Sequence, residues 1–185
     1  FVIMKKLLLL FHTLKYLRWP QFYFRIYRKL VTPKVTEQFS GELPKRNADF
    51  VFASLFDEKI TQSMQATFLS FTKQLELPHD WDDEAHSKLW VYNLHYFEDL
   101  LATNAQTKHA FHINLLDTWQ AQNPVGQGNG WEPYCISLRA VNWIKWFCHK
   151  RAADVSEHWE SSLGVQVGVL EQLLERHILA NHLFA

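Results

Sequence analysis

The fold of this chain is decided by a stretch that reads GWEPYCISLRAVNWIKWFC from Gly130 to Cys148. Its apolar residues recur at spacings of three and four, which predicts one continuous helix over 135–152. The same pattern predicts further helices over 87–103, 109–122 and 155–179. Helices joined by short loops pack as antiparallel hairpins. We therefore expect a mainly α fold.

A small β element is expected before these helices. It comprises a short strand over 50–56 and an extended pair over 67–77. Two short basic helices are predicted within 7–30, broken at a proline. The chain accordingly divides into basic N-terminal helices with a connecting arm over 1–47 and a helical domain over 48–185.

The composition is that of a globular protein, with 48% hydrophobic residues and only 6 Gly and 6 Pro. The net charge of zero gives no reason to expect a nucleic-acid partner. The first 36 residues, however, carry eight basic and no acidic side chains. Such basic, aromatic helices either dock on their own domain or lie on an anionic membrane surface.

The sequence also bears on location. No stretch approaches the roughly 20 apolar residues of a membrane span. The start imitates a secretory signal, but His12 and Lys15 interrupt its apolar run and no small-residue cleavage site follows. Cys135 and Cys148 lie about 20 Å apart on one helix, too far for a disulfide. We expect a cytoplasmic protein, with a periplasmic or membrane-peripheral location as the alternatives.

Two segments are candidates for ligand contact. In the aromatic stretch 89–97, Asn93 and Tyr96 share a helix face that can either stack a sugar or pack in the core. The Gly-rich loop 123–134 leads into Arg139, whose planar guanidinium suits a carboxylate ligand or an ion pair with Glu132 or another helix glutamate. We expect the loop to lie at a rim of the helical array, beside a cleft.

Neither a nucleotide nor a metal is expected. The Gly-rich loop lacks a following Gly-Lys-Ser or Gly-Lys-Thr, so the sequence predicts no nucleotide cofactor. His109 and His112 are three apart, and His177 and His182 five apart, but no further ligand stands at a diagnostic interval. We therefore expect no metal.

Three segments, 90–97, 130–146 and 181–183, resemble heparinase II/III-family proteins, and the similarity runs over roughly residues 7 to 185. The resemblance implies an incomplete α/α toroid followed by a large antiparallel β-sandwich. It also implies cleavage of an anionic, uronic-acid-containing polysaccharide by β-elimination. The alternative is a non-catalytic glycan-binding or scaffold module, linked to cell-surface polysaccharide metabolism and possibly membrane-peripheral.

The resemblance further implies roles for individual residues. Asn181 and His182 match a catalytic pair that neutralises the substrate carboxylate, although Asn181 could instead cap a helix. The acid or base tyrosine and a further histidine come later in the family than Ala185, so we expect this chain to lack its C-terminal part and to be inactive alone. The expected substrate-binding residues are Asn93, His95, Tyr96, Trp131, Glu132, Tyr134, Arg139, Asn142 and Trp143.

Overall fold

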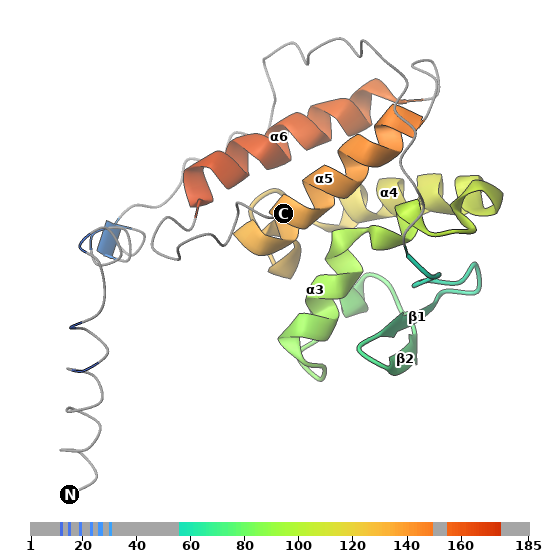
Figure 1. The fold of residues 1–185 in the computed structure, drawn as a ribbon, viewed down its shortest axis with the longest axis horizontal. Coiled ribbons are helices and arrows are strands. Elements are labelled where there is room, and N and C mark those ends of the chain that lie inside the picture. The colour runs from blue at the N-terminus through green and yellow to red at the C-terminus, as the bar shows by residue number, and fades with distance from the viewer. Residues whose placement is uncertain are drawn as a thin grey trace, which may run out of the picture.

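The computed structural model describes residues 56–149 and 155–174, together with seven isolated helical positions between His12 and Leu30. The main elements are β1 (Gln65–Phe68), β2 (Phe71–Gln74), α3 (Lys88–Tyr96), α4 (His109–Gln122), α5 (Pro133–His149) and α6 (Glu157–Leu173). The described part is mostly helical, with a two-stranded sheet beside α3 (Figure 1). A mainly α fold with a small β element is therefore confirmed.

Several expectations fall outside the described residues. These are the arm over 31–47, the division at 47/48 and the pair Asn181 and His182. Of the strand expected over 50–56, only Phe56 is described, and it forms an isolated parallel bridge with Ala102. No helix among the described residues is long and apolar enough to cross a membrane.

The extended pair forms an antiparallel hairpin, in which Gln65 pairs with Gln74 and Phe68 with Phe71. Leu69 and Ser70 make its turn with φ values of 53° and 63°. Positive φ at both turn residues matches the right-handed twist of a hairpin. The buried ring of Phe68 meets Trp90 of α3 edge-on, with ring centroids 5.3 Å apart. The hairpin is thereby attached to the helical core.

Helix α3 is shorter than the predicted 87–103. Ser87 caps its start by accepting a hydrogen bond from the Trp90 amide at 3.3 Å. The helix ends at Tyr96 because Phe97 has a left-handed φ of 58°, and a 3-10 turn over Glu98–Leu101 follows. Phe97 is buried against the rings of Trp119 and Trp143. Burial of this ring stabilises the left-handed backbone of Phe97, which the spacing of apolar residues does not predict.

Helix α4 has the expected bounds. α5 begins at Pro133, two residues before its expected start, and is described as far as His149. α6 begins at Glu157 and ends at Leu173, where Leu174 leaves the helical conformation with a ψ of 125°, so the expectation of an unbroken helix to 179 is wrong. α5 and α6 lie side by side and run in opposite directions (Figure 1). Two contacts fix this arrangement: Trp146 packs on Trp159, and Arg139 bonds to Gln166. The two helices are thus one antiparallel hairpin.

The core gathers around α5. Of the side chains expected there, Trp90, Phe97, Leu116, Trp119 and Phe147 are buried. The expectation for Ile144 is wrong, because its side chain is 46% exposed. Trp143 and Phe147 face inward at a spacing of four, and successive helix residues are rotated by about 100°. Ile144 therefore points away from the core.

Candidate functional site

The Gly-rich loop between α4 and α5 is held by direct contacts with its neighbours. Trp131 donates its indole Nε1–H to the Asn123 carbonyl across the loop, at 3.1 Å. A Cβ atom at Gly130 would lie 2.7 Å from Nδ1 of His95, so only glycine fits there. Gly128, with a φ of 74°, lies against Asp82 in the same way. The glycines thus permit close packing against the α3 region.

His95 is a buried structural histidine. Its Nδ1 accepts the indole Nε1–H of Trp119 at 3.0 Å, so its Nε2 carries the proton and donates to the Trp81 carbonyl at 2.8 Å. Burial, assisted by the charge of Arg139, lowers the pKa of His95 to about 4. The ring is therefore neutral near pH 7 and has both nitrogens occupied.

Arg139 is completely buried and ties three segments together. Its Nε donates to Gln166 Oε1 of α6 at 2.7 Å, and one terminal nitrogen donates to the Gly130 carbonyl at 2.7 Å. The guanidinium carbon lies 3.9 Å from the ring centroid of Trp119. Burial lowers the pKa of Arg139 to about 9, which leaves it charged near pH 7. Among the described residues it has no carboxylate partner, so the alternative of an ion pair with Glu132 or another helix glutamate is not realised there.

Asn142 and Trp143 join α5 to the end of α3. Asn142 donates its side-chain amide to the Tyr96 carbonyl at 2.8 Å, which satisfies a carbonyl at the C-terminus of α3. The Trp143 ring lies edge-on to both Phe97 and Trp119. Burial raises the pKa of Tyr96 well above its ordinary value.

The structure therefore brings six of the expected substrate-binding residues together in the core, and of these only Trp131 also lines a pocket. These six are His95, Tyr96, Trp131, Arg139, Asn142 and Trp143. The polar groups of His95, Trp131 and Asn142 bond to backbone carbonyls, and those of Arg139 do so in part. The Tyr96 hydroxyl, the Trp143 indole nitrogen and one terminal nitrogen of Arg139 are buried without a hydrogen-bond partner among the described residues. Asn93, Glu132 and Tyr134 are only partly buried. Direct contact of any of these residues with a substrate stays a prediction.

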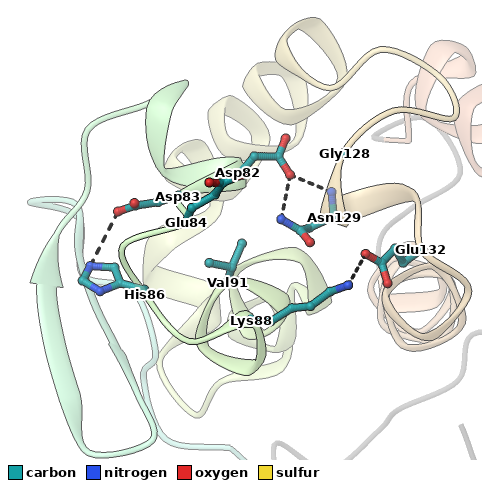
Figure 2. A pocket seen from close by; sticks show the side chains of 9 residues that line it. All are labelled: Asp82, Asp83, Glu84, His86, Lys88, Val91, Gly128, Asn129 and Glu132. Atoms are coloured by element: carbon teal, nitrogen blue, oxygen red, sulfur yellow. Dashed lines mark hydrogen bonds and ion pairs between the residues drawn. The ribbon is translucent and has the colours of Figure 1, made fainter.

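A cleft of about 670 Å³ opens between the start of α3, the segment 82–86 and the Gly-rich loop (Figure 2). Glu132 is the one expected substrate-binding residue among its lining residues. It accepts hydrogen bonds from Lys88 at 2.6 Å and from the Tyr92 hydroxyl. Opposite it, Asp82 accepts the backbone and side-chain N–H groups of Asn129 at 2.6 and 2.9 Å.

The charge of this cleft is unfavourable for a uronate. Asp82, Asp83, Glu84 and Glu132 line it, and Lys88 is the only lysine or arginine among its lining residues. Like charges nearby disfavour a further carboxylate. The cleft is better suited to the hydroxyl groups of a neutral sugar.

A cluster of His79, Asp80 and Asp83 has the spacing of metal ligands. The Lys73 ammonium already lies 2.7 Å from a carboxylate oxygen of each aspartate. Burial alone would raise the pKa of Asp80, but hydrogen bonds from Lys73, the Glu76 backbone and His79 together outweigh it and lower that pKa. For Asp83, the hydrogen bond from Lys73 is the main cause that lowers the pKa. We interpret the cluster as a salt bridge that fastens β2 to the following turn.

A second ionic cluster is centred on Asp99, which lies against the backbone of residues 59 and 60. Asp99 Oδ1 accepts the backbone N–H groups of Lys59 and Ile60. Its Oδ2 accepts from Lys108 at 2.5 Å and from His112 Nε2 at 2.9 Å. Asp99, Lys108 and His112 are all buried. Sequence reasoning missed this cluster, because spacing indicates His112 only as a possible metal ligand.

A smaller pocket of about 230 Å³ lies between the end of α4, the Gly-rich loop and the first half of α6. Trp131 and Asn123 contribute to it from the loop, and Ser161 and Ser162 from α6. The serines carried no signal in the sequence, because hydroxyl residues are ordinary on an amphipathic helix. The Gly-rich loop thus contributes residues to both the acidic cleft and this pocket.

Comparisons with protein-family models, with curated proteins and with solved structures found no match for this chain.

Proposed function

We propose that this chain is the N-terminal helical part of a heparinase II/III-like polysaccharide lyase. The complete enzyme would cleave a uronic-acid-containing polysaccharide by β-elimination. The described helices would then be consecutive hairpins of an incomplete α/α toroid. The proposal rests on the sequence resemblance carried by the segments 90–97 and 130–146, and one structural observation supports it.

That observation is that the two resembling segments form one connected unit. Asn142 bonds to the Tyr96 carbonyl, and Arg139 bonds to the Gly130 carbonyl and, at 3.5 Å, to the His95 carbonyl. Glu132 also accepts a hydrogen bond from Tyr92. Motif residues that hold each other in this way have a physical reason to occur together in a sequence. This supports a shared scaffold rather than a chance match.

The proposed chemistry needs donors that are fixed before the reaction begins. A base removes the proton at C5 of the uronate, the electron pair forms the C4–C5 double bond, and the C4–O bond breaks as its oxygen is protonated. Hydrogen-bond donors on the carboxylate stabilise the negative charge that develops. By resemblance, Asn181 and His182 supply them, and the tyrosine that transfers the proton comes later in the family sequence.

The test is to extend the reading frame past Ala185 and assay the product. The proposal requires a downstream tyrosine, a downstream histidine and a β-rich region. The encoded protein should then release an unsaturated, ultraviolet-absorbing product from at least one polymer in a panel of uronic-acid polysaccharides. The 185-residue chain alone should release none. An extended protein without these residues would contradict the lyase and favour a non-catalytic glycan-binding module.

A second candidate role is attachment to a membrane surface. The described helical positions at the N-terminus expose large apolar side chains, including Trp19 at 80% and Leu30 at 78%. The stretch 1–36 carries eight basic and no acidic residues. Aromatic groups combined with basic groups favour an anionic bilayer surface. Flotation with anionic vesicles should therefore recover the chain, whereas neutral vesicles or deletion of residues 1–34 should abolish recovery.

A further inference from the structure

The small pocket beside α6 differs in character from the acidic cleft of Figure 2. Its volume of about 230 Å³ is on the scale of one sugar residue and below the roughly 300 Å³ at which drug-sized sites begin. Two of its lining residues are Trp119 and Trp131, whose ring centroids lie 5.8 Å apart at 34°. Both side chains are nearly buried, so the core fixes their positions. The pocket has a rigid aromatic wall.

A chain of hydrogen bonds sets the direction of a donor at this pocket. Arg139 can only donate, so the oxygen of the Gln166 amide must face it. The nitrogen of Gln166 therefore faces Ser162 and donates to its Oγ at 3.2 Å. Ser162 thus uses its oxygen as an acceptor and keeps its own proton for another partner. Within the described residues, the Ser162 hydroxyl donates no hydrogen bond.

A second donor at the pocket also lacks a partner. The amide nitrogen of Gln120 is buried and makes no hydrogen bond within the part of the chain that the structure describes. A buried N–H group without an acceptor is destabilising, because it has lost its hydrogen bonds to water. A ligand that supplied an acceptor would remove this cost. Gln120 and Ser162, from α4 and α6, both line the same pocket.

The charges around the pocket favour an anion. No aspartate or glutamate lines it. His158, a lining residue, pairs with Asp117 at 3.0 Å, and this carboxylate also accepts the Trp159 indole N–H at 2.7 Å. Arg139, stacked on Trp119, supplies a buried positive charge without a carboxylate partner among the described residues.

We propose that this pocket binds a single uronyl residue, whose carboxylate accepts hydrogen bonds from the Ser162 hydroxyl and the Gln120 amide. The choice of a uronyl ligand rests on the proposed lyase function. The acidic cleft on the other part of the loop would then contact a neutral sugar of the same polymer. This assigns a uronyl residue other than the reacting one to side chains that, apart from Trp131, the resemblance does not single out, because Asn181 and His182 would hold the reacting carboxylate.

The test is a titration of the isotope-labelled 185-residue chain with sodium glucuronate, followed by ¹H–¹⁵N NMR. The Trp131 indole and Gln120 side-chain signals should shift and saturate. Glucose and acetate should each bind at least tenfold more weakly, because neither offers both the ring and the carboxylate. A tenfold difference in Kd corresponds to about 1.4 kcal/mol.

Variants identify the donors. Ser162→Ala should raise the Kd for glucuronate at least fivefold. Gln120→Glu has a similar size but places a negative charge in the pocket, and it should abolish binding. Gln172→Ala, at an exposed site of the same helix α6, is the control and should leave the Kd unchanged. Unchanged indole signals outside the pocket show that each variant is folded.

The inference is overturned if glucuronate causes no saturable shift, if glucose or acetate binds equally well, or if both pocket variants bind like the wild type. These outcomes are separate from the fate of the lyase proposal. Binding that follows the predicted variants, in a protein whose extended form releases no unsaturated product, would retain the pocket and reject the lyase. Lyase activity without glucuronate binding at this pocket would retain the lyase proposal and reject the pocket.

Discussion

Asp99→Asn should lower the free energy of unfolding by about 3 kcal/mol, because the Lys108 ammonium would lose its buried carboxylate partner. Among the described residues it would keep only the partly exposed carboxylate of Glu58, at 3.0 Å. Both carboxylate oxygens of Asp99 are occupied. One accepts from the amides of Lys59 and Ile60 at 2.7 and 3.0 Å, and the other from Lys108 and His112 at 2.5 and 2.9 Å. The side-chain amide of asparagine would place its NH₂ group either against the Lys108 ammonium or against the backbone N–H groups of Lys59 and Ile60. In both orientations donors would face donors.

The pH dependence of unfolding gives a second estimate of how much the ionised Asp99 carboxylate stabilises the fold. Burial alone would raise the pKa of Asp99, but hydrogen bonds from His112, Lys108 and the backbone outweigh it and hold the pKa at about 2. The pKa in the unfolded chain is about 3.9. Because the folded value is lower, the unfolded state binds more protons between these values. The stabilisation is therefore complete above about pH 4 and is lost as the pH falls through about 2, and it amounts to about 2–3 kcal/mol.

The assay is urea unfolding monitored by tryptophan fluorescence at several pH values between 3 and 7. The exposed Asp57 serves as the control, and Asp57→Asn should change stability by less than about 0.5 kcal/mol. Adding Lys108→Met to Asp99→Asn removes the buried ammonium that has lost its closer partner, leaves the partly exposed Glu58 to solvent, and should recover part of the loss. A loss below about 1 kcal/mol at pH 7, or a wild-type pH dependence in Asp99→Asn, would refute this account of the cluster.

Three further predictions concern the loop, the core and the proposed chemistry. Gly130→Ala should lower the free energy of unfolding in urea by about 2 kcal/mol, because the new Cβ would lie 2.7 Å from His95 Nδ1. Gly168→Ala, whose Cβ would have nothing within 4 Å, should instead stabilise α6 by about 1 kcal/mol. Ile144→Lys should change the melting midpoint little, while Phe147→Ala should cost about 3–5 kcal/mol. In a protein that contains the later residues, Asn181→Ala should lower kcat about a hundredfold with a small change in KM; unchanged kcat with a lower melting temperature would indicate a helix cap instead.

Much of the fold could be predicted, because apolar spacing reports directly on which face of a helix is buried. Helix α4 has the predicted bounds, and the hairpin overlaps the predicted extended pair, although β1 begins two residues before it. The errors arise where tertiary contacts decide the structure. Phe97 ends α3 in a left-handed conformation held by Trp119 and Trp143, and Ile144 is exposed because its neighbours already fill the inward face.

The candidate site was harder to predict, since sequence names polar groups but not their partners. His95, Arg139 and Asn142 have side chains suited to binding sugars, yet each bonds to a backbone carbonyl in the core. The pocket beside α6 was missed because its two donors, Gln120 and Ser162, lie 42 positions apart in the sequence. Among the described residues, neither the Gln120 amide nitrogen nor the Ser162 hydroxyl donates a hydrogen bond.

The buried guanidinium of Arg139 also restricts how this sequence can vary among relatives. It needs an amide oxygen from α6, the carbonyl of Gly130 and the face of an indole, three features contributed by three separate segments. Lysine could not reproduce this geometry, because an ammonium group lacks the planar fork that serves two acceptors and a ring at once. A relative that replaces Gln166 with an apolar residue should therefore also replace Arg139. Substitutions at these two positions, 27 residues apart, are expected to occur as pairs across any alignment of homologues.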